Sequence, residues 1–158
     1  MSAFVVFYGE NQNLVIRKED LDAFQWINNN VPVGQRFLII TGVKPLEDPT
    51  SEWIPAPTSQ TSLSIVQGRE WLAKEDFYAI LKKSSYLQLC PLQDFTCVDK
   101  WKQGSEASFD FVYFRKLQIQ DQYGTKYIEW PLEQSMMETE LYQKIYEAEY
   151  TDILQVKK

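Results

Sequence analysis

The strongest constraint on the fold is the apolar centre of residues 36–41, where Phe37 to Ile40 follow one another without a polar residue between them. A strand whose apolar side chains are consecutive has both of its faces covered, as in a parallel or mixed sheet. Just before it, Leu21, Phe24 and Ile27 recur at helical spacing and predict a helix over residues 19–29. Asp20 is expected to cap the start of this helix.

The remaining segments also alternate in type. After a loop over residues 42–61 we expect a strand at 62–66 that Gly68 ends, a helix at 74–84, a strand at 109–114, a helix at 131–139 that begins with Pro131, and strands at 142–148 and 150–156. This order predicts an α/β fold: a mixed, mostly parallel sheet with helices on its faces and an antiparallel C-terminal strand pair.

The length of 158 residues fits one domain over residues 1–158, and no linker divides it. Residues 4–8 and 14–17 are β-rich and flank a polar turn. We therefore interpret residues 1–18 either as a hairpin or as the remnant of a segment that leaves a membrane.

The loop over residues 42–61 contains four prolines, and loops of this length are usually functional or disordered. Trp53 and Ile54 lie within it and argue against disorder. This loop is therefore the first place to look for a binding surface.

The composition excludes several classes of function. The chain has no histidine, which excludes Ser-His-Asp and Cys-His catalysis and histidine-bearing zinc sites. The formal net charge of -6 disfavours nucleic acid, which binds proteins mainly through their lysine and arginine side chains. We assign no catalytic residue, metal or cofactor.

No apolar run approaches the length that crosses a bilayer, and the N-terminal residues lack the positive charge of a signal peptide. If the chain is complete as given, we expect it in the cytoplasm. If it is part of a longer protein, that expectation changes.

Three stretches, taken together, resemble a known family. They run from Asp22 through Trp26 to Gly42, from Asp48 through Glu52-Trp53-Ile54-Pro55 to Gln67-Gly68-Arg69-Glu70-Trp71-Leu72, and from Leu87 to Tyr113. The pattern is similar to the soluble tail of bacterial membrane glycosyltransferases related to dolichyl-phosphate-mannose protein mannosyltransferases. The resemblance covers roughly residues 19–156, and the loop followed by residues 67–72 is its most specific part.

The resemblance implies a GT-C type enzyme that transfers a sugar from a polyprenyl-phosphate carrier. The catalytic acid of such an enzyme lies near its membrane spans, so the resemblance assigns no catalyst to this piece. It also implies a position on the extracytoplasmic face of the membrane. The implied partners are the membrane-embedded portion of the enzyme and a carbohydrate or polyprenyl-linked sugar.

Five residues of the familiar stretches are ligand-binding candidates: Glu52, Trp53, Gln67, Glu70 and Trp71. Aromatic rings, among them Trp53, Trp71 and Tyr78, suit the apolar faces of sugars, although the two tryptophans are more simply expected to pin the loop onto the sheet. The Gln67 amide suits a ligand hydroxyl or, more simply, a loop carbonyl.

The acidic candidates have two interpretations as well. Asp48, Glu52 and Glu70 would support a hydrolase if two of them converged in a cleft. More simply, they cap the turns that follow or pair with Arg36 or Arg69.

Cys90 and Cys97 are candidates for a disulfide, which requires an oxidising compartment such as the one that the resemblance implies. The alternative is two buried thiols that pack as small apolar groups.

We therefore expect a non-catalytic extramembrane domain of a polyprenyl-phosphate-sugar-dependent glycosyltransferase, which frames the acceptor or donor or docks on the membrane part. An apolar patch with a polar rim would mark the docking surface. The alternative is a free-standing acidic protein-binding module, similar to an immunity protein, which captures a basic target.

Overall fold

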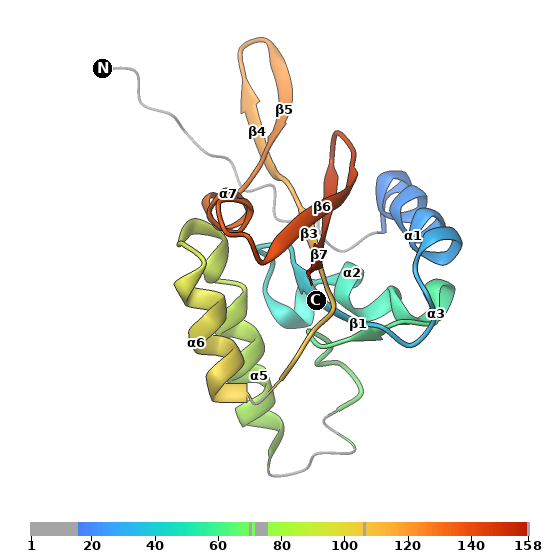
Figure 1. Ribbon diagram of the computed structural model, residues 1–158, viewed down its shortest axis with the longest axis vertical. Helices are drawn as coiled ribbons and strands as arrows, with labels where there is room; N and C mark the ends of the chain where they lie inside the picture. Colours follow the sequence, from blue (N-terminus) through green and yellow to red (C-terminus); the bar gives the residue numbers. More distant parts are fainter. Residues whose placement is uncertain (1–15, 70, 72–75, 106, 158) are drawn as a thin grey trace.

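The computed structural model describes residues 16–69, 71, 76–105 and 107–157. Its centre is a five-stranded sheet with the strand order β2-β1-β3-β7-β6 (Figure 1). The strands are β1 (Arg36–Ile40), β2 (Thr61–Ser62), β3 (Phe111–Arg115), β6 (Tyr142–Glu147) and β7 (Thr151–Val156). β1 pairs in parallel with β2 and β3, whereas β7 pairs antiparallel with β3 and β6. The predicted α/β class, with its antiparallel C-terminal pair, is confirmed.

Helices cover both faces of the sheet. One face carries α1 (Lys18–Asn30), α2 (Pro49–Trp53) and α3 (Pro55–Thr58), and the other carries α5 (Phe77–Leu87), α6 (Thr96–Ser105) and α7 (Pro131–Met137) (Figure 1). Phe37 and Ile39 pack in the α1 layer, and Leu38 and Ile40 pack in the opposite layer. All four side chains are fully buried, which explains the continuous apolar run of β1.

Several element predictions are confirmed with small shifts. The helices predicted at 19–29 and 131–139 are α1 and α7, and the helix predicted at 74–84 is α5, which ends three residues later. The two C-terminal strands are β6 and β7. Most of the N-terminal hairpin predicted within residues 1–18 lies outside the described residues, and the described Ile16 and Arg17 form no strand.

Asp20 caps the start of α1, as predicted, but it does so from inside the helix. Arg17 occupies the N-cap, and Asp20 is the third residue of the helix. Its Oδ2 atom accepts a hydrogen bond from the backbone N–H of Arg17 at 3.2 Å, and the side chain is fully buried. Asp20 therefore points into the protein, where it has other partners.

The strand predicted at 62–66 is shorter than expected, because β2 ends at Ser62. Beyond that point the side chain of Ser64 replaces the backbone of a neighbouring strand. Its Oγ accepts from the Ile39 N–H at 3.0 Å and donates to the Ile39 carbonyl at 2.9 Å. Gly68 has a φ of +79°, as expected for a glycine that ends the segment.

The segment over residues 42–61 is a series of short helices rather than a plain loop. The 3₁₀ helix η1 (Pro45–Glu47), α2 and α3 each begin with a proline. Proline suits the first turn of a helix because its fixed φ matches the helix and its missing N–H is not needed there. The prolines therefore mark helix starts.

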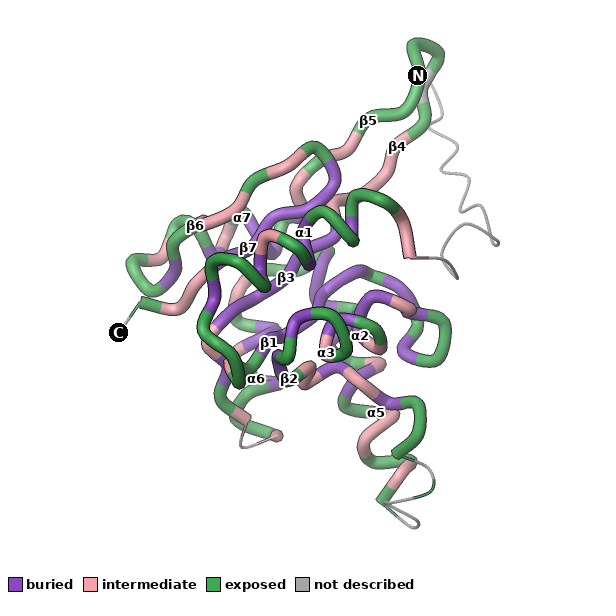
Figure 2. Tube along the Cα trace, turned by 90° about the vertical axis from the view of Figure 1, so that its right-hand side faces the viewer, coloured by how far each residue is buried: buried purple, intermediate pink, exposed green. Residues whose placement is uncertain are grey.

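A helix and a hairpin were not predicted. α6 contains the second cysteine, and Cys97, Val98 and Trp101 give it a buried stripe. Strands β4 (Leu117–Asp121) and β5 (Gly124–Ile128) form a separate antiparallel hairpin. The hairpin projects from the body of the protein, and β5 is largely exposed (Figures 1 and 2).

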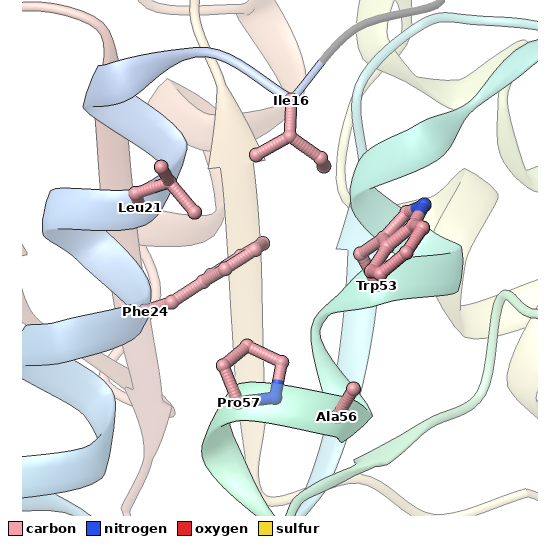
Figure 3. A pocket seen from close by; sticks show the side chains of 6 residues that line it. All are labelled: Ile16, Leu21, Phe24, Trp53, Ala56 and Pro57. Carbon is pink, nitrogen blue, oxygen red and sulfur yellow. The ribbon is translucent and has the colours of Figure 1, made fainter.

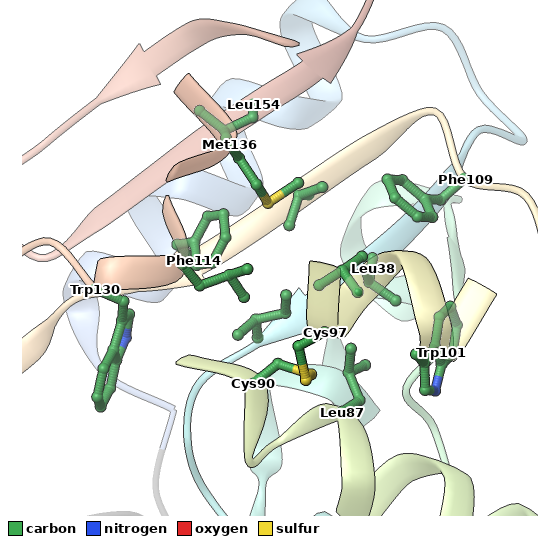
Figure 4. Packing of buried hydrophobic residues seen from close by; sticks show 14 of the residues in the cluster. Leu38, Leu87, Cys90, Cys97, Trp101, Phe109, Phe114, Trp130, Met136 and Leu154 are labelled. Atoms are coloured by element: carbon green, nitrogen blue, oxygen red, sulfur yellow. A yellow bond between two sulfur atoms is a disulfide. The ribbon is translucent and has the colours of Figure 1, made fainter. Parts of the chain in front are cut away.

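A disulfide joins Cys90 and Cys97. It links the 3₁₀ helix η3 (Cys90–Leu92) to the start of α6 within the apolar layer that also contains Leu87 and Leu38 (Figure 4). Both cysteines are buried. The bond therefore ties together two consecutive helices that cover one face of the sheet.

Replacing both cysteines with serine should lower the free energy of unfolding by at least about 2.5 kcal/mol, the chain-entropy value for a ring of this size. Urea unfolding with and without reductant measures the effect. Reductant should lower the stability of the wild-type protein and leave the double variant unchanged. Equal stability of the wild-type protein in both conditions would contradict a structural role for the bond.

Candidate functional site

An apolar pocket lies between α1 and the α2–α3 segment (Figure 3). Its volume is about 500 Å³, within the range of small-molecule sites. Ile16, Leu21 and Phe24 line one side, and Trp53, Ala56 and Pro57 line the other. Six apolar side chains thus surround a space that is open to solvent.

Trp53 belongs to this pocket rather than to the core. Its side chain is 60% exposed, so the prediction that it pins the loop onto the sheet is wrong. Ile54 has that role instead, because it is fully buried and packs in the same layer as Phe37 and Ile39. With Ile54 anchored beneath it, Trp53 faces α1 across the pocket (Figure 3).

Asp48 positions the Trp53 side of the pocket. The carboxylate caps α2 by accepting from the backbone N–H of Thr50 at 3.1 Å, and it also accepts from the hydroxyl of Thr41 at 3.0 Å. Burial raises the pKa of Asp48, while Arg115 and these donors act in the opposite direction. The simpler interpretation of Asp48, a helix cap, is the one that the structure supports.

A buried polar network holds the two sides of the pocket together. Asp20 of α1 forms an ion pair with Arg115 of β3, with Nη2 and Oδ2 3.2 Å apart. The other carboxylate oxygen of Asp20 accepts from the Tyr113 hydroxyl at 2.7 Å and from the Thr50 hydroxyl at 3.3 Å. Arg115 also donates to Thr50. One carboxylate therefore connects α1, α2 and β3.

The electrostatics of this network keep Arg115 charged. Burial lowers the pKa of Arg115, but the nearby Asp20, together with Tyr150, Asp48 and Tyr113, more than offsets that effect, so the pKa is raised overall. Burial and the adjacent Asp20 charge raise the pKa of Tyr113 well above its ordinary value. The tyrosine therefore remains protonated and able to donate at neutral pH.

Glu52 and Gln67 fasten neighbouring segments to each other. The backbone N–H of Gln67 donates to Glu52 Oε1 at 3.1 Å, and Gln67 Nε2 donates to the Leu46 carbonyl at 3.1 Å. The interpretation of the Gln67 amide as a partner for a loop carbonyl is supported. Both residues hold the chain beside Trp53, and neither lines the pocket.

The other aromatic candidates lie at the surface. Trp71 is 82% exposed, so the prediction that it pins the loop is wrong as well, and Tyr78 is also exposed. Glu70 lies outside the described residues. Among the candidates that the structure describes, Trp53 alone lines the pocket.

A second cluster of charges lies at α7, on the other face of the sheet. Oxygen atoms of Glu129, Glu133 and Asp152 lie within 4.8 Å of one another, and the ammonium group of Lys144 contacts all three carboxylates. The lysine occupies the position that a cation would take. This grouping is thus an internal ion cluster of the protein.

Neither buried charge cluster was predicted, although each has a signal in the sequence. Asp20 shares the helix face of Ala23, Phe24 and Ile27, and a carboxylate on an apolar stripe implies a buried partner. Arg115 similarly continues the buried run of β3. Glu133 lies beside Leu132 within the buried face of α7.

A scan of protein-family models, a search of curated proteins and a search of solved structures found no match for this chain. Within the described ranges, no helix is both long enough and apolar enough to cross a membrane. The site is therefore interpreted from its own geometry and from the resemblance given above.

Replacing Asp20 with asparagine should lower the free energy of unfolding by about 3–5 kcal/mol, because it leaves Arg115 buried without its counter-charge. Asp22→Asn is the matched control, because Asp22 pairs with Lys18 at the surface of the same helix. Asp22→Asn should lower the free energy of unfolding by less than about 1 kcal/mol. Chemical denaturation of the three proteins measures the difference, and equal losses would refute the role given to Asp20.

Proposed function

We propose that this chain is a non-catalytic extramembrane domain of a membrane glycosyltransferase that uses a polyprenyl-phosphate sugar, and that it docks on the membrane-embedded part through the apolar pocket. The observation that carries the proposal is which segments of the sequence supply the side chains that line the pocket. Leu21 and Phe24 come from the helix that opens the familiar pattern, and Trp53 comes from its Glu-Trp-Ile-Pro loop. Segments that the resemblance groups in sequence are thus neighbours in space.

The chemistry of the pocket favours docking over capture of a free sugar. A sugar ring carries hydroxyl groups that lose their water on binding and require hydrogen-bond partners. The six lining side chains are apolar apart from the indole N–H of Trp53. An apolar surface of a partner protein, or a hydrocarbon chain, suits such a lining better.

The disulfide is consistent with the extracytoplasmic placement. Disulfides persist in oxidising compartments and are rare in the cytosol. The Cys90–Cys97 bond is buried in the apolar layer behind α5 and α6. The alternative, a free-standing acidic binding module in the cytoplasm, would place this bond in a reducing compartment.

The open reading frame that encodes this chain provides the first test. We expect many membrane spans within the same reading frame or in an adjacent gene. A locus without membrane spans would contradict the proposal, whereas recovery of a basic protein as the sole stoichiometric partner would support the alternative module.

Two substitutions in the intact enzyme test the docking surface. Trp53→Ala and Leu21→Ser should lower sugar transfer, and the tryptophan change should lower it by about thirtyfold, the effect of removing a typical interface hot spot. Leu92→Ser is the matched control, because Leu92 is 67% exposed and lies outside the pocket. Transfer rates that are equal in all variants would overturn docking through the pocket.

A further inference from the structure

The charge cluster at α7 contains more negative than positive groups. Three carboxylates, those of Glu129, Glu133 and Asp152, face two ammonium groups, those of Lys116 and Lys144. Glu133 and Asp152 are completely buried. An unbalanced charge that is buried in this way destabilises the folded state by several kcal/mol unless a counter-ion or a proton neutralises it.

The hydrogen bonds show which carboxylates of the cluster lack a donor. Asp152 Oδ2 accepts from Lys144 at 3.0 Å and is paired with Lys116 at 3.1 Å. Lys144 Nζ lies 3.1 Å from Glu133 Oε1, and it donates hydrogen bonds to Glu129 and Asp152. Within the described part of the chain, Oε2 of Glu133 and Oδ1 of Asp152 have no hydrogen-bond donor.

A single proton resolves both the surplus charge and the missing donors. A protonated carboxyl group donates one hydrogen bond, and a neighbouring carboxylate accepts it. We propose that Glu133 and Asp152 share one proton, and that this proton is a latch that holds α7 and both ends of the β4–β5 hairpin on the sheet.

The connections of the cluster explain why the latch acts on these elements. Glu133 belongs to α7, and Asp152 and Lys144 belong to the paired strands β7 and β6. Lys116 immediately precedes β4, and Glu129 immediately follows β5. The hairpin, which projects from the body (Figure 2), is thus attached at each end to a member of the cluster.

The electrostatics support the same assignment. Burial, and after it the hydrogen bond and charge of Asp152, raise the pKa of Glu133 to about 8 although Lys144 acts against both. The pKa of Lys144 is raised above its ordinary value by its carboxylate partners despite its desolvation, so it stays charged. Burial and the nearby charges of Asp22 and Asp152 raise the pKa of Tyr146, so its phenol stays neutral.

The sign of the pH dependence follows from linkage. The folded protein binds the proton more tightly than the open state does, so the contribution of the latch is complete below the ordinary carboxyl pKa of 4.5. It falls as the pH rises above that value and is lost at about 8, where Glu133 releases its proton in the folded protein. Above that pH, three carboxylates face two ammonium groups.

Hydrogen exchange of the full chain tests the latch. After correction for the intrinsic rate, amide protection in α7 and the hairpin should fall about tenfold to a hundredfold between about pH 6 and about pH 9. Glu133→Gln should abolish this fall, because the amide donates to Asp152 and does not ionise. Glu138→Gln, an exposed change just after the same helix, should retain the wild-type fall.

An unchanged pH dependence in Glu133→Gln would overturn the proposal. If that variant does not fold, infrared difference spectra of the wild-type protein decide the question. A carboxylic-acid band that is present at about pH 6 and lost by about pH 9 supports the latch, and its absence at about pH 6 overturns it. These measurements do not depend on the proposed docking function.

Discussion

The ion pair between Asp20 and Arg115 is the interaction on which the arrangement of the pocket depends. A buried charge pair tolerates little displacement, because loss of either partner leaves the other unpaired in a medium that solvates it poorly. Asp20 also accepts hydrogen bonds from Tyr113 and Thr50, so α1, α2 and β3 meet at one carboxylate. The distance between the two sides of the pocket is set by these polar contacts behind it, because its own apolar lining leaves the space open.

Much of the order of elements could be predicted because α1, β1, α5, β3, α7, β6 and β7 each carry a local signal, whereas α6 and the β4–β5 hairpin were missed. The apolar centre of β1 indicated a strand covered on both faces, and the structure places Phe37 and Leu38 in opposite layers. Where prediction failed, tertiary contacts had replaced a local rule. The segment after β2 was expected to continue as a strand, but the side chain of Ser64 takes over the hydrogen bonds of Ile39.

The candidate site was only partly predictable, because burial decides the role of a residue and sequence does not report burial directly. Trp53 and Ile54 are adjacent apolar residues in the same loop, yet one lines the pocket and the other is fully buried. Their roles depend on which side of α2 faces the sheet, and this is determined by the cap at Asp48 and the network around Asp20. From the sequence, Asp48 and Asp20 were expected only to cap the start of a turn or helix.

The two clusters differ in how their buried carboxylates are stabilised. Around Asp20, hydroxyl groups and an arginine supply donors to both carboxylate oxygens. At Glu133, no hydroxyl group of the described residues donates to the carboxyl group; its neighbours there are carboxylates and an ammonium group. A carboxylate that lacks neutral donors retains a proton because neutralisation costs less than an unsatisfied buried charge. The network behind the pocket therefore satisfies its carboxylate with an arginine and neutral donors, whereas we propose that the cluster at α7 does so with a shared proton.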